Sequence, residues 1–314
     1  MIAGFNDLVT LVKAGGPRKA AVACAAGEEV LKAMARAQDE GIARCVLVGD
    51  TGEIRTKARN AGLDPDDFEI VHRLEPSMAV RQAVHMVRHG EADVLVKGRV
   101  DTASFLRAVL DREAGLRAGH LISHVVVLER PENKGFLLMS DAAINVAPDL
   151  RQKVEIVRNV IVVARALGIN RPRVAFVAAL ERITPNMPAT VEAAVLAKMG
   201  ERGQLGQIVA DGPFALDVAV SPEAGLIKGV RGEVAGKADI VVAPDIEAGN
   251  MVYKALVHLA GWSAAGVVAG AVAPIVLPSR ADSAENKFRS LAFGIFLAEA
   301  GLQAPLGAPE RVTG

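Results

Sequence analysis

The sequence has few cysteines, few aromatic residues and no net charge, and each shortage excludes a class of protein. Only Cys24 and Cys45 occur among 314 residues, each in a run expected to form a buried strand. Such thiols pack as small apolar groups and fit a reducing cytoplasm better than a disulfide framework. Aromatic residues make up 4%, which argues against a stacking surface for single-stranded nucleic acid. Basic and acidic residues balance at 36 each without a long basic run, so neither a nucleic acid nor a membrane surface is an expected partner.

Several binding and catalytic motifs are also missing. No Gly-x-Gly-x-x-Gly follows the early strands, the segment 49–52 does not fit one, and no P-loop occurs, which excludes the usual nucleotide sites. No Gly-x-Ser-x-Gly elbow anchors a serine-hydrolase triad. The six histidines lack metal-ligand spacing: His85 and His89 are four residues apart, but without a third ligand they indicate one helix face. No metal site is predicted.

Two stretches bear on where the protein is found. The N-terminus has no basic region followed by an apolar block, so no signal peptide is expected. The most apolar window, 255–277, is interrupted by His258, three glycines and Pro274. A buried helix, turn and strand explain this window better than a membrane span. We expect a cytoplasmic protein.

Apolar runs alternate with helical patterns, which predicts an α/β fold with a mostly parallel sheet and helices on both faces. Runs 125–128 and 135–139 lie too close together for a crossover and predict a hairpin. Two lobes are expected, the first from residues 1–122 plus 275–314 and the second from 123–274. The other expected strands are 20–26, 45–48, 68–71, 92–96, 174–179, 207–210, 239–243 and 266–277, and the main helices are 28–39, 77–88, 102–113, 150–167, 189–199, 248–260 and 283–300.

The segment 277–287 brings a hydroxyl, a guanidinium and a carboxylate to a strand-to-helix junction. A helix N-terminus has unpaired N–H groups and a partial positive charge, which suits an anion, phosphate above all. The guanidinium of Arg280 would add a planar pair of donors. A simpler reading is that Ser283 or Asp282 caps the helix and Arg280 is solvated.

Polar side chains follow three further strands. Ligands of parallel sheets bind beyond the carboxyl ends of strands, so these junctions are the candidate sites. Each also has a structural reading: Asp245 suits a helix cap, Ser140–Asp141 an Asx turn, and Lys97 and Arg107 solvent. Polar groups recur at one strand end after another. A single site, with phosphate-binding groups facing each other across a cleft, explains this recurrence more economically than a separate structural role for each group. The three junctions contain Lys97, Thr102 and Arg107; Ser140, Asp141 and Asn145; and Asp245, Glu247, Asn250 and Lys254.

These junctions resemble those of the phosphate acetyltransferase/phosphate butyryltransferase family. Lys97-Gly98 with Thr102 and Leu106-Arg107 resembles the first-lobe block, and Ser140-Asp141 with Asn145 resembles the hairpin block. Ser279-Arg280 resembles the pair at the active site of the family. The likeness runs from about residue 20 to 300, and two of its most recognisable segments are matched by 211–217 and by 244–250 with Tyr253-Lys254.

The resemblance implies a two-lobed fold of the isocitrate/isopropylmalate dehydrogenase type, a homodimer, and an active site in the cleft between the lobes. It implies reversible transfer of a short acyl group, acetyl, propionyl or butyryl, between coenzyme A and inorganic phosphate. The coenzyme A thioester is a substrate, and no permanently bound cofactor is expected. In the acetyl branch an aspartate seven residues after the serine takes the thiol proton, but here that position is Asn286. An amide cannot be a base, so 281–287 looks closer to the butyryl branch.

On this reading Arg280 and Arg107 hold phosphate with Lys97 and Thr102, and Ser279 donates a hydrogen bond to the thioester oxygen or the departing sulfur. Asp282 or Glu285 could act as the missing base. The acyl-CoA group would be bound by Ser140, Asp141, Asn145, Asp245, Glu247, Asn250 and Lys254. Two alternatives stay open: a non-catalytic acyl-CoA sensor of the same fold, and a decarboxylating dehydrogenase, which would need a cluster of aspartates around a divalent cation.

Overall fold

The structure, a computed structural model, describes residues 2–131 and 134–301. Strands and helices alternate along the chain, and the contacts between Cα atoms divide it into two units. Among the described residues, unit 2 contains 4–120 and 264–301, and unit 1 contains 2–3, 121–131 and 134–263. The predicted α/β class with largely parallel strand pairing is confirmed.

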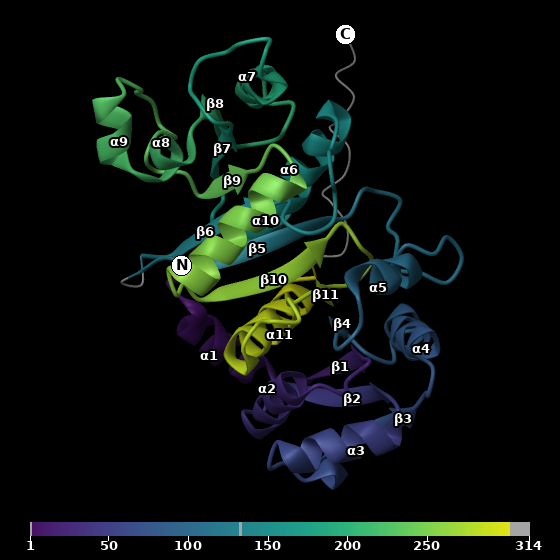
Figure 1. Ribbon diagram of the computed structural model, residues 1–314. Coiled ribbons are helices and arrows are strands. Elements are labelled where there is room, and N and C mark those ends of the chain that lie inside the picture. Colours follow the sequence, from purple (N-terminus) through teal and green to yellow (C-terminus); the bar gives the residue numbers. More distant parts are fainter. Residues whose placement is uncertain (1, 132–133, 302–314) are drawn as a thin grey trace. The chain divides into compact units, whose positions relative to one another are not determined.

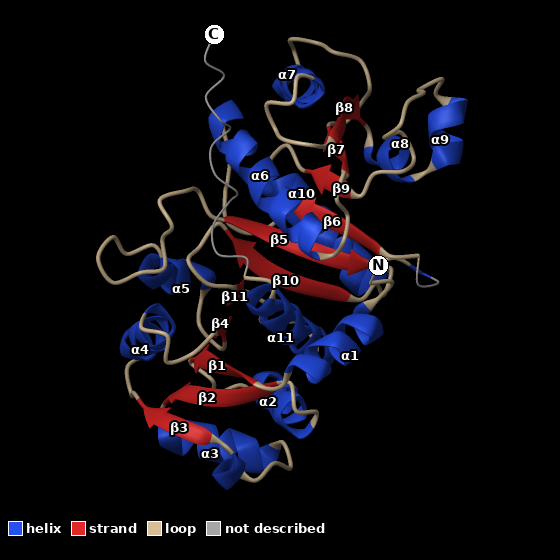
Figure 2. Cartoon of the chain, turned by 180° about the vertical axis from the view of Figure 1, so that it is seen from behind, coloured by secondary structure: helices blue, strands red, loops and turns tan. Residues whose placement is uncertain are grey.

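Unit 2 has the strand order β3-β2-β1-β4-β11-β10, in which every pair is parallel except β10 with β11. Helices α2 and α11 lie on one face of these strands, and α4 and α5 on the other (Figures 1 and 2). The elements of unit 2 are α1 (Phe5–Gly15), β1 (Arg18–Ala23), α2 (Glu28–Asp39), β2 (Ala43–Gly49), α3 (Thr51–Asn60), η1 (Pro65–Asp67), β3 (Glu69–His72), α4 (Pro76–Arg88), β4 (Val94–Lys97), α5 (Thr102–Val109), β10 (Ala264–Ala269), β11 (Ile275–Val276) and α11 (Ala284–Glu299).

Helix α11 is the packing centre of unit 2. Its residues from Asn286 to Leu297 are buried almost without a break, and it packs on α1, α2 and β10. At Gly294 a Cβ would lie 2.5 Å from a methyl group of Val276 and 3.2 Å from one of Val94, so the helix approaches the strands closely because this residue has no side chain. At this residue α11 is thereby held against β4 and β11, the strands that lead to the predicted phosphate site.

Unit 1 has the strand order β5-β6-β9-β7-β8. The predicted hairpin is confirmed, because β5 and β6 pair antiparallel, and the other pairs are parallel. The elements of unit 1 are β5 (Ser123–Glu129), β6 (Phe136–Ser140), α6 (Leu150–Ala166), β7 (Arg173–Val177), α7 (Pro188–Glu201), β8 (Val209–Phe214), α8 (Leu216–Val220), α9 (Pro222–Ile227), β9 (Ile240–Val242), α10 (Ile246–Lys254) and the π-helical turn η3 (Ala255–Leu259).

Three local expectations are corrected. The run 266–277 is not one strand: it forms β10 and β11, paired antiparallel around Gly270, whose φ is +89°, and Pro274. Strand β10 therefore belongs to unit 2, whereas the expected boundary at 274/275 put it in the second lobe. The segment 49–52 does not merely end a strand, because Asp50 caps α3 through the N–H of Glu53. The short helices α8 and α9 were not expected.

Both cysteines are buried and free, as predicted. Burial raises the pKa of Cys24 to about 11 and that of Cys45 to about 12, so neither thiol is ionised near neutral pH. None of the helices in residues 2–131 and 134–301 combines the length and apolar character that a bilayer span requires. Over the same residues, no three His, Cys, Asp or Glu side chains gather as metal ligands would.

Candidate functional site

A buried lysine lies at the carboxyl end of β4 in unit 2. Lys97 is the last residue of this strand and is 2% exposed. Within the described residues its ammonium group makes no hydrogen bond and no ion pair at salt-bridge distance. Burial lowers the pKa of Lys97 to about 8, and the positive charges of Arg280 and Lys287 act in the same direction. A charge held this way normally finds a counterion, so the end of β4 is suited to an anion.

The turn after Leu277 supplies the neighbouring groups. The carboxylate of Asp282, which is buried, accepts a hydrogen bond from the backbone N–H of Ser279 at 2.7 Å, and the N–H of Asp282 donates to the Ser279 carbonyl at 3.2 Å. Buried Lys287 donates to the carbonyl oxygens of Arg280, at 3.4 Å, and of Asp282. The turn is thus fixed by its own residues while the Arg280 side chain is exposed.

The N-terminus of α11 is largely satisfied by protein groups. Ser283 caps the helix through the N–H of Asn286 at 3.2 Å, and Glu29 of α2 accepts the N–H of Ala284 at 2.9 Å. The capping interpretation of Ser283 is therefore confirmed. An anion at this junction would rely on side-chain cations, with little help from free N–H groups of the helix.

The candidate base Glu285 and its neighbour Asn286, which stands where the acetyl branch has its aspartate, differ in their surroundings. Glu285 forms ion pairs with Arg36 and, at 3.1 Å, with Arg289, so its carboxylate is already engaged. Asn286 is buried, and its side-chain oxygen accepts bonds from the N–H of Ala264 at 3.4 Å and from Arg289 at 3.0 Å. Position 286 therefore joins α11 to β10 and has no acid–base capacity.

The loop from β4 to α5 holds the remaining phosphate candidates. Asp101 caps α5 by accepting the N–H of Ser104 at 2.8 Å, and Thr102 follows at the first helical position, half-buried. Arg107 lies on α5 with an exposed side chain, and its charge acts on Asp101. Lys97, Arg280 and Asp282 are therefore electrostatically coupled, whereas Arg107 is not among the groups that shift Lys97.

Gly98 allows the end of β4 to meet the end of β1. A Cβ at this residue would lie 2.4 Å from the carbonyl oxygen of Cys24 and 2.6 Å from that of Ala23. The N–H groups of Gly98 and Arg99 donate to those same two carbonyls, at 2.8 and 2.7 Å. This backbone contact fixes the position of Gly98. It therefore also sets the direction in which the chain continues after β4.

In unit 1 the carboxylate of Asp141 organises the loop after β6. It is buried and accepts backbone N–H groups of His124, Ala143, Ile144 and Asn145, together with the side-chain amide of Asn145 at 2.6 Å. The hydroxyl of Ser140 donates to the His124 carbonyl at 2.9 Å. These polar atoms stabilise the loop by hydrogen bonds within it and to β5, in agreement with the Asx-turn interpretation.

The start of α10 packs against the same loop. Asp245 caps the helix through the N–H of Ala248 at 2.8 Å, and Asn250 donates to the Ala142 carbonyl at 2.8 Å. Glu247 is exposed in the first turn, and the ammonium of Lys254 lies 5.9 Å from the centre of the Tyr253 ring. Glu247 and Lys254 thus keep side-chain groups that the fold does not use for hydrogen bonds.

The role of Asp141 can be tested by replacing it with asparagine. The amide keeps one acceptor oxygen but brings two donors to a site where several N–H groups converge, so we expect Asp141→Asn to lower the free energy of unfolding by about 2–4 kcal/mol. Denaturant unfolding measures this change. Asp149→Asn is the matched control, because Asp149 is an exposed cap and asparagine caps equally well. Equal stability of the two variants would contradict the structural role.

Sequence reasoning missed two contributors to the unit 2 site. Lys287 and Glu29 are absent from the predicted set, although each fixes the turn or the helix start. Lys287 lies four residues after Ser283 and so on the inner face of α11. This helical spacing could have identified Lys287 from the sequence. Glu29 comes from α2 and gives no such signal, because only the fold brings it to position 284.

The chain is thus an α/β protein in which the carboxyl end of β4 in unit 2 carries a group of cationic side chains. The chain matches the model of the Phosphate acetyl/butaryl transferase family over residues 5–77 and 74–295. A phosphate butyryltransferase of Clostridium acetobutylicum is 47% identical over 298 residues, which cover 95% of this chain and 99% of that protein. A phosphate acetyltransferase of Thermotoga maritima is 42% identical over 294 residues, covering 94% and 99%. The chain belongs to the Phosphate acetyl/butaryl transferase family, so the predicted resemblance and the acyltransferase class are confirmed.

Solved structures agree with this assignment. The crystal structure of a branched-chain phosphotransacylase from Enterococcus faecalis matches with a TM-score of 0.79 and 32% identity, covering 90% of this chain and 99% of that one. A 4-hydroxythreonine-4-phosphate dehydrogenase from Klebsiella pneumoniae matches with a TM-score of 0.54 and 13% identity, over 90% and 99% of the two chains. The second likeness shows only that the fold is shared with a dehydrogenase.

Proposed function

We propose that the chain transfers a short acyl group between coenzyme A and inorganic phosphate, giving an acyl phosphate. The observation that carries the proposal is Lys97, a buried lysine whose ammonium makes no hydrogen bond or ion pair within the described residues and whose pKa is lowered by burial and by the charges of Arg280 and Lys287 in unit 2. Such a group suits a small, highly charged anion. Butyryl is the first acyl group to test, because the relatives at 43–47% identity are named as phosphate butyryltransferases, one of them as probable.

In the forward reaction a phosphate oxygen attacks the thioester carbonyl carbon. A tetrahedral oxyanion forms, the carbon–sulfur bond breaks, and coenzyme A leaves as thiolate, which takes up a proton. Arg280 and Lys97 bind and orient phosphate with Thr102 and Arg107, and they reduce its repulsion from the coenzyme A phosphates. Ser279, whose backbone is held by Asp282, donates a hydrogen bond from its hydroxyl to the thioester oxygen or the departing sulfur and keeps its proton.

The reverse reaction needs a group that removes the thiol proton, and the surroundings favour Lys97 and Asp282 over Glu285. Glu285 is engaged by two arginines. Asp282 positions Ser279 and stays close enough to act on the charge of Lys97. Burial brings the pKa of Lys97 to about 8, near that of a free thiol, so Lys97 exchanges a proton with coenzyme A or stabilises its thiolate.

The groups proposed for acyl-CoA belong to unit 1. Glu247 and Lys254 have side chains available for a ligand, and Lys254 meets a phosphate of coenzyme A. Ser140, Asp141, Asn145, Asp245 and Asn250 hold the loop and the start of α10 in place, so they act as positioning residues. The two units correspond, on this proposal, to the lobes of an isocitrate/isopropylmalate dehydrogenase-like fold. The working form is a homodimer in the cytoplasm.

A thiol-release assay tests the proposed activity. Acetyl-, propionyl- and butyryl-CoA are each supplied with phosphate, and free thiol is measured against a sulfate control. We expect phosphate-dependent release with at least one acyl group. Arsenate in place of phosphate should give continuous release, because acyl arsenates hydrolyse. No release with any acyl-CoA would reject the enzyme and leave the alternative below.

That alternative is a non-catalytic acyl-CoA sensor, and one observation favours it: Asn286 stands where the acetyl branch has its aspartate and serves only packing. A sensor would bind butyryl-CoA in calorimetry without releasing thiol. The decarboxylating dehydrogenase has less support, because residues 2–131 and 134–301 contain no cluster of carboxylates of the kind it requires.

A further inference from the structure

Unit 1 has a cavity that the proposed reaction does not use. It has a volume of about 660 Å³, within the usual range for small-molecule sites. It lies where β6, β7 and β9 begin, with lining residues Phe136, Arg173 and Asp239 at or next to those strand starts. The loops with Ser140 and Asp245 follow the other ends of β6 and β9, so the cavity is at the opposite edge of the unit 1 strands.

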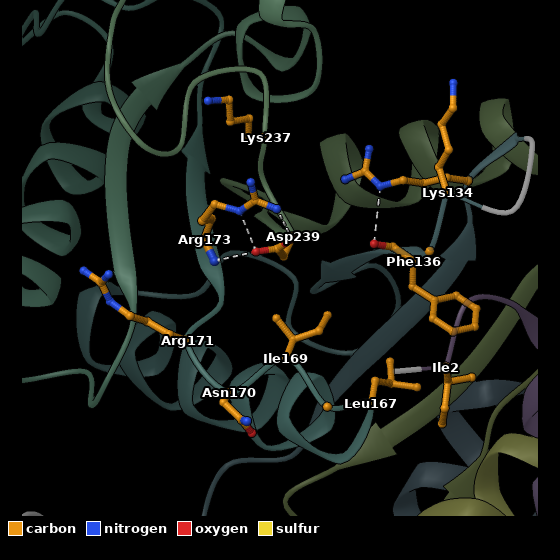
Figure 3. A pocket seen from close by; sticks show the side chains of 13 residues that line it. Ile2, Lys134, Phe136, Leu167, Ile169, Asn170, Arg171, Arg173, Lys237 and Asp239 are labelled. Atoms are coloured by element: carbon orange, nitrogen blue, oxygen red, sulfur yellow. Dashed lines mark hydrogen bonds and ion pairs between the residues drawn. The ribbon is translucent and has the colours of Figure 1, made fainter.

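The lining is cationic on one side. Arg130, Lys134, Arg171, Arg173 and Lys237 line it, against a single carboxylate, that of Asp239. This carboxylate is fully engaged by Arg173, whose Nε and Nη2 donate at 2.9 and 2.7 Å and whose backbone N–H donates at 2.8 Å. Figure 3 shows this pair beneath Lys237, while Lys134 and Arg171 extend away.

Two cations therefore keep an uncompensated charge. The guanidinium of Arg130, half-buried, donates to the carbonyls of Ala238 at 2.5 Å and Phe136 at 3.4 Å, and it makes no ion pair within the described residues. Burial lowers the pKa of Arg130, and the charge of Arg173 acts in the same direction while that of Asp239 opposes it. Lys237 precedes Ala238 in the chain, is exposed, and likewise has no ion pair in the described parts of the chain.

The other side of the cavity is apolar. Ile2, Phe136 and Leu167 lie together, and Ile169 lies between them and the ion pair of Arg173 with Asp239 (Figure 3). Two free positive charges match the charge of a phosphate monoester, which is close to −2 near neutral pH. The apolar wall would cover a hydrocarbon or aromatic group attached to it.

We propose that this cavity binds a small phosphate monoester with an apolar substituent, held by Arg130 and Lys237 at its head and by Ile2, Phe136 and Leu167 at its tail. The site belongs to unit 1 alone and is separate from the anion site at Lys97. Its occupancy does not depend on the proposed acyl transfer.

Calorimetry of the full chain with phenylphosphonate, at about pH 8 where the group is a dianion, tests the proposal. We expect one site, with weaker binding of methylphosphonate, which lacks the ring, and of benzoate, which carries one charge. Lys237→Gln should weaken phenylphosphonate binding about tenfold, by loss of a charged partner. Lys198→Gln removes a lysine elsewhere on unit 1 and should leave it unchanged, as should Arg280→Gln.

Arg130→Lys is the second variant, since it keeps the charge but loses the planar donors, and it too should weaken binding. Unfolding curves show whether either variant is folded. Absence of phenylphosphonate binding overturns the proposal. So does unchanged affinity in Lys237→Gln, or loss of binding in Arg280→Gln, which would assign the ligand to the Lys97 site. Thiol release by Lys237→Gln should match that of the unmodified chain, which separates this site from the proposed reaction.

Discussion

Arg280→Ala should lower kcat/KM for phosphate about 30- to 1000-fold, a loss of about 2–4 kcal/mol, the usual cost of truncating one partner of a buried charge contact. Arg280 is exposed and forms no ion pair with a carboxylate in residues 2–131 and 134–301, so its guanidinium is available to phosphate. The backbone of the turn is fixed by Asp282 and Lys287, which do not need the Arg280 side chain. The loss should therefore appear in phosphate kinetics while stability stays nearly unchanged.

Arg59→Ala is the control for this measurement. Arg59 is an exposed arginine near the end of α3 in the same unit, so its removal changes net charge equally without touching the site. Arg280→Lys should recover part of the activity, because the charge returns without the two parallel donors. Near-normal phosphate kinetics in Arg280→Ala would show that Arg280 does not bind phosphate. An equal loss in Arg59→Ala would show that the effect comes from the change in net charge and not from a contact at the site.

The sequence could predict the elements whose signals are local. Alternating apolar runs predicted most strands of both units, and the short spacing of 125–128 and 135–139 predicted the β5–β6 hairpin. Ser283 and Asp245 were recognised as possible helix caps because a hydroxyl or carboxylate just before a helical pattern has few other local uses. Both cap their helices.

Other features depend on what lies opposite in space. The run 266–277 has no interior polar residue to show a break, so its division into β10 and β11 is set by pairing with β4 and by Gly270. Asp141 looked like a ligand group in the sequence, but its carboxylate faces backbone N–H groups of its own loop and of β5. Periodicity cannot show which donors a buried carboxylate will meet.

The two proposed anion sites also differ in how far local sequence could reveal them. Lys97 could be singled out because it ends a strand, although nothing local showed that it would be buried without a partner. The cavity of unit 1 combines Arg173 and Lys237, at or before the starts of β7 and β9, with Arg130, which follows the end of β5. The edge where parallel strands begin carries no general expectation of binding. Its charge balance becomes visible only when Asp239 is seen to be engaged by Arg173.

Lys97→Met should make the protein more stable and less active. Methionine has a similar length and no charge, so it removes the cost of burying an ammonium group without a counterion. The pKa of Lys97 falls from 10.5 to about 8 on folding, which corresponds to a gain on the order of 3 kcal/mol for the variant near neutral pH. Loss of one preorganised cation should at the same time lower kcat about 100- to 1000-fold.

The stability difference should depend on pH in a defined direction. Between about pH 8 and 10.5 the unfolded chain holds the Lys97 proton and the folded chain does not, so the stability of the unmodified protein rises with pH in this window. Below the window the full cost of burying the charge is present. The advantage of Lys97→Met should thus be largest below about pH 8 and shrink as the pH rises toward the upper limit. Denaturant unfolding across this range measures it.

Lys153→Met is the matched control, because Lys153 is equally buried but donates to Glu192. Its removal leaves a carboxylate without its partner and should lower stability. Phosphate should also stabilise the unmodified protein more than Lys97→Met, since a ligand that binds only the folded state adds to its stability. A Lys97→Met variant that is less stable than the unmodified protein at neutral pH would mean that the ammonium group has a structural partner. Retained activity would mean that the anion is held elsewhere. Higher stability together with lost turnover is the result expected if the Lys97 ammonium binds the ligand while its burial destabilises the folded protein.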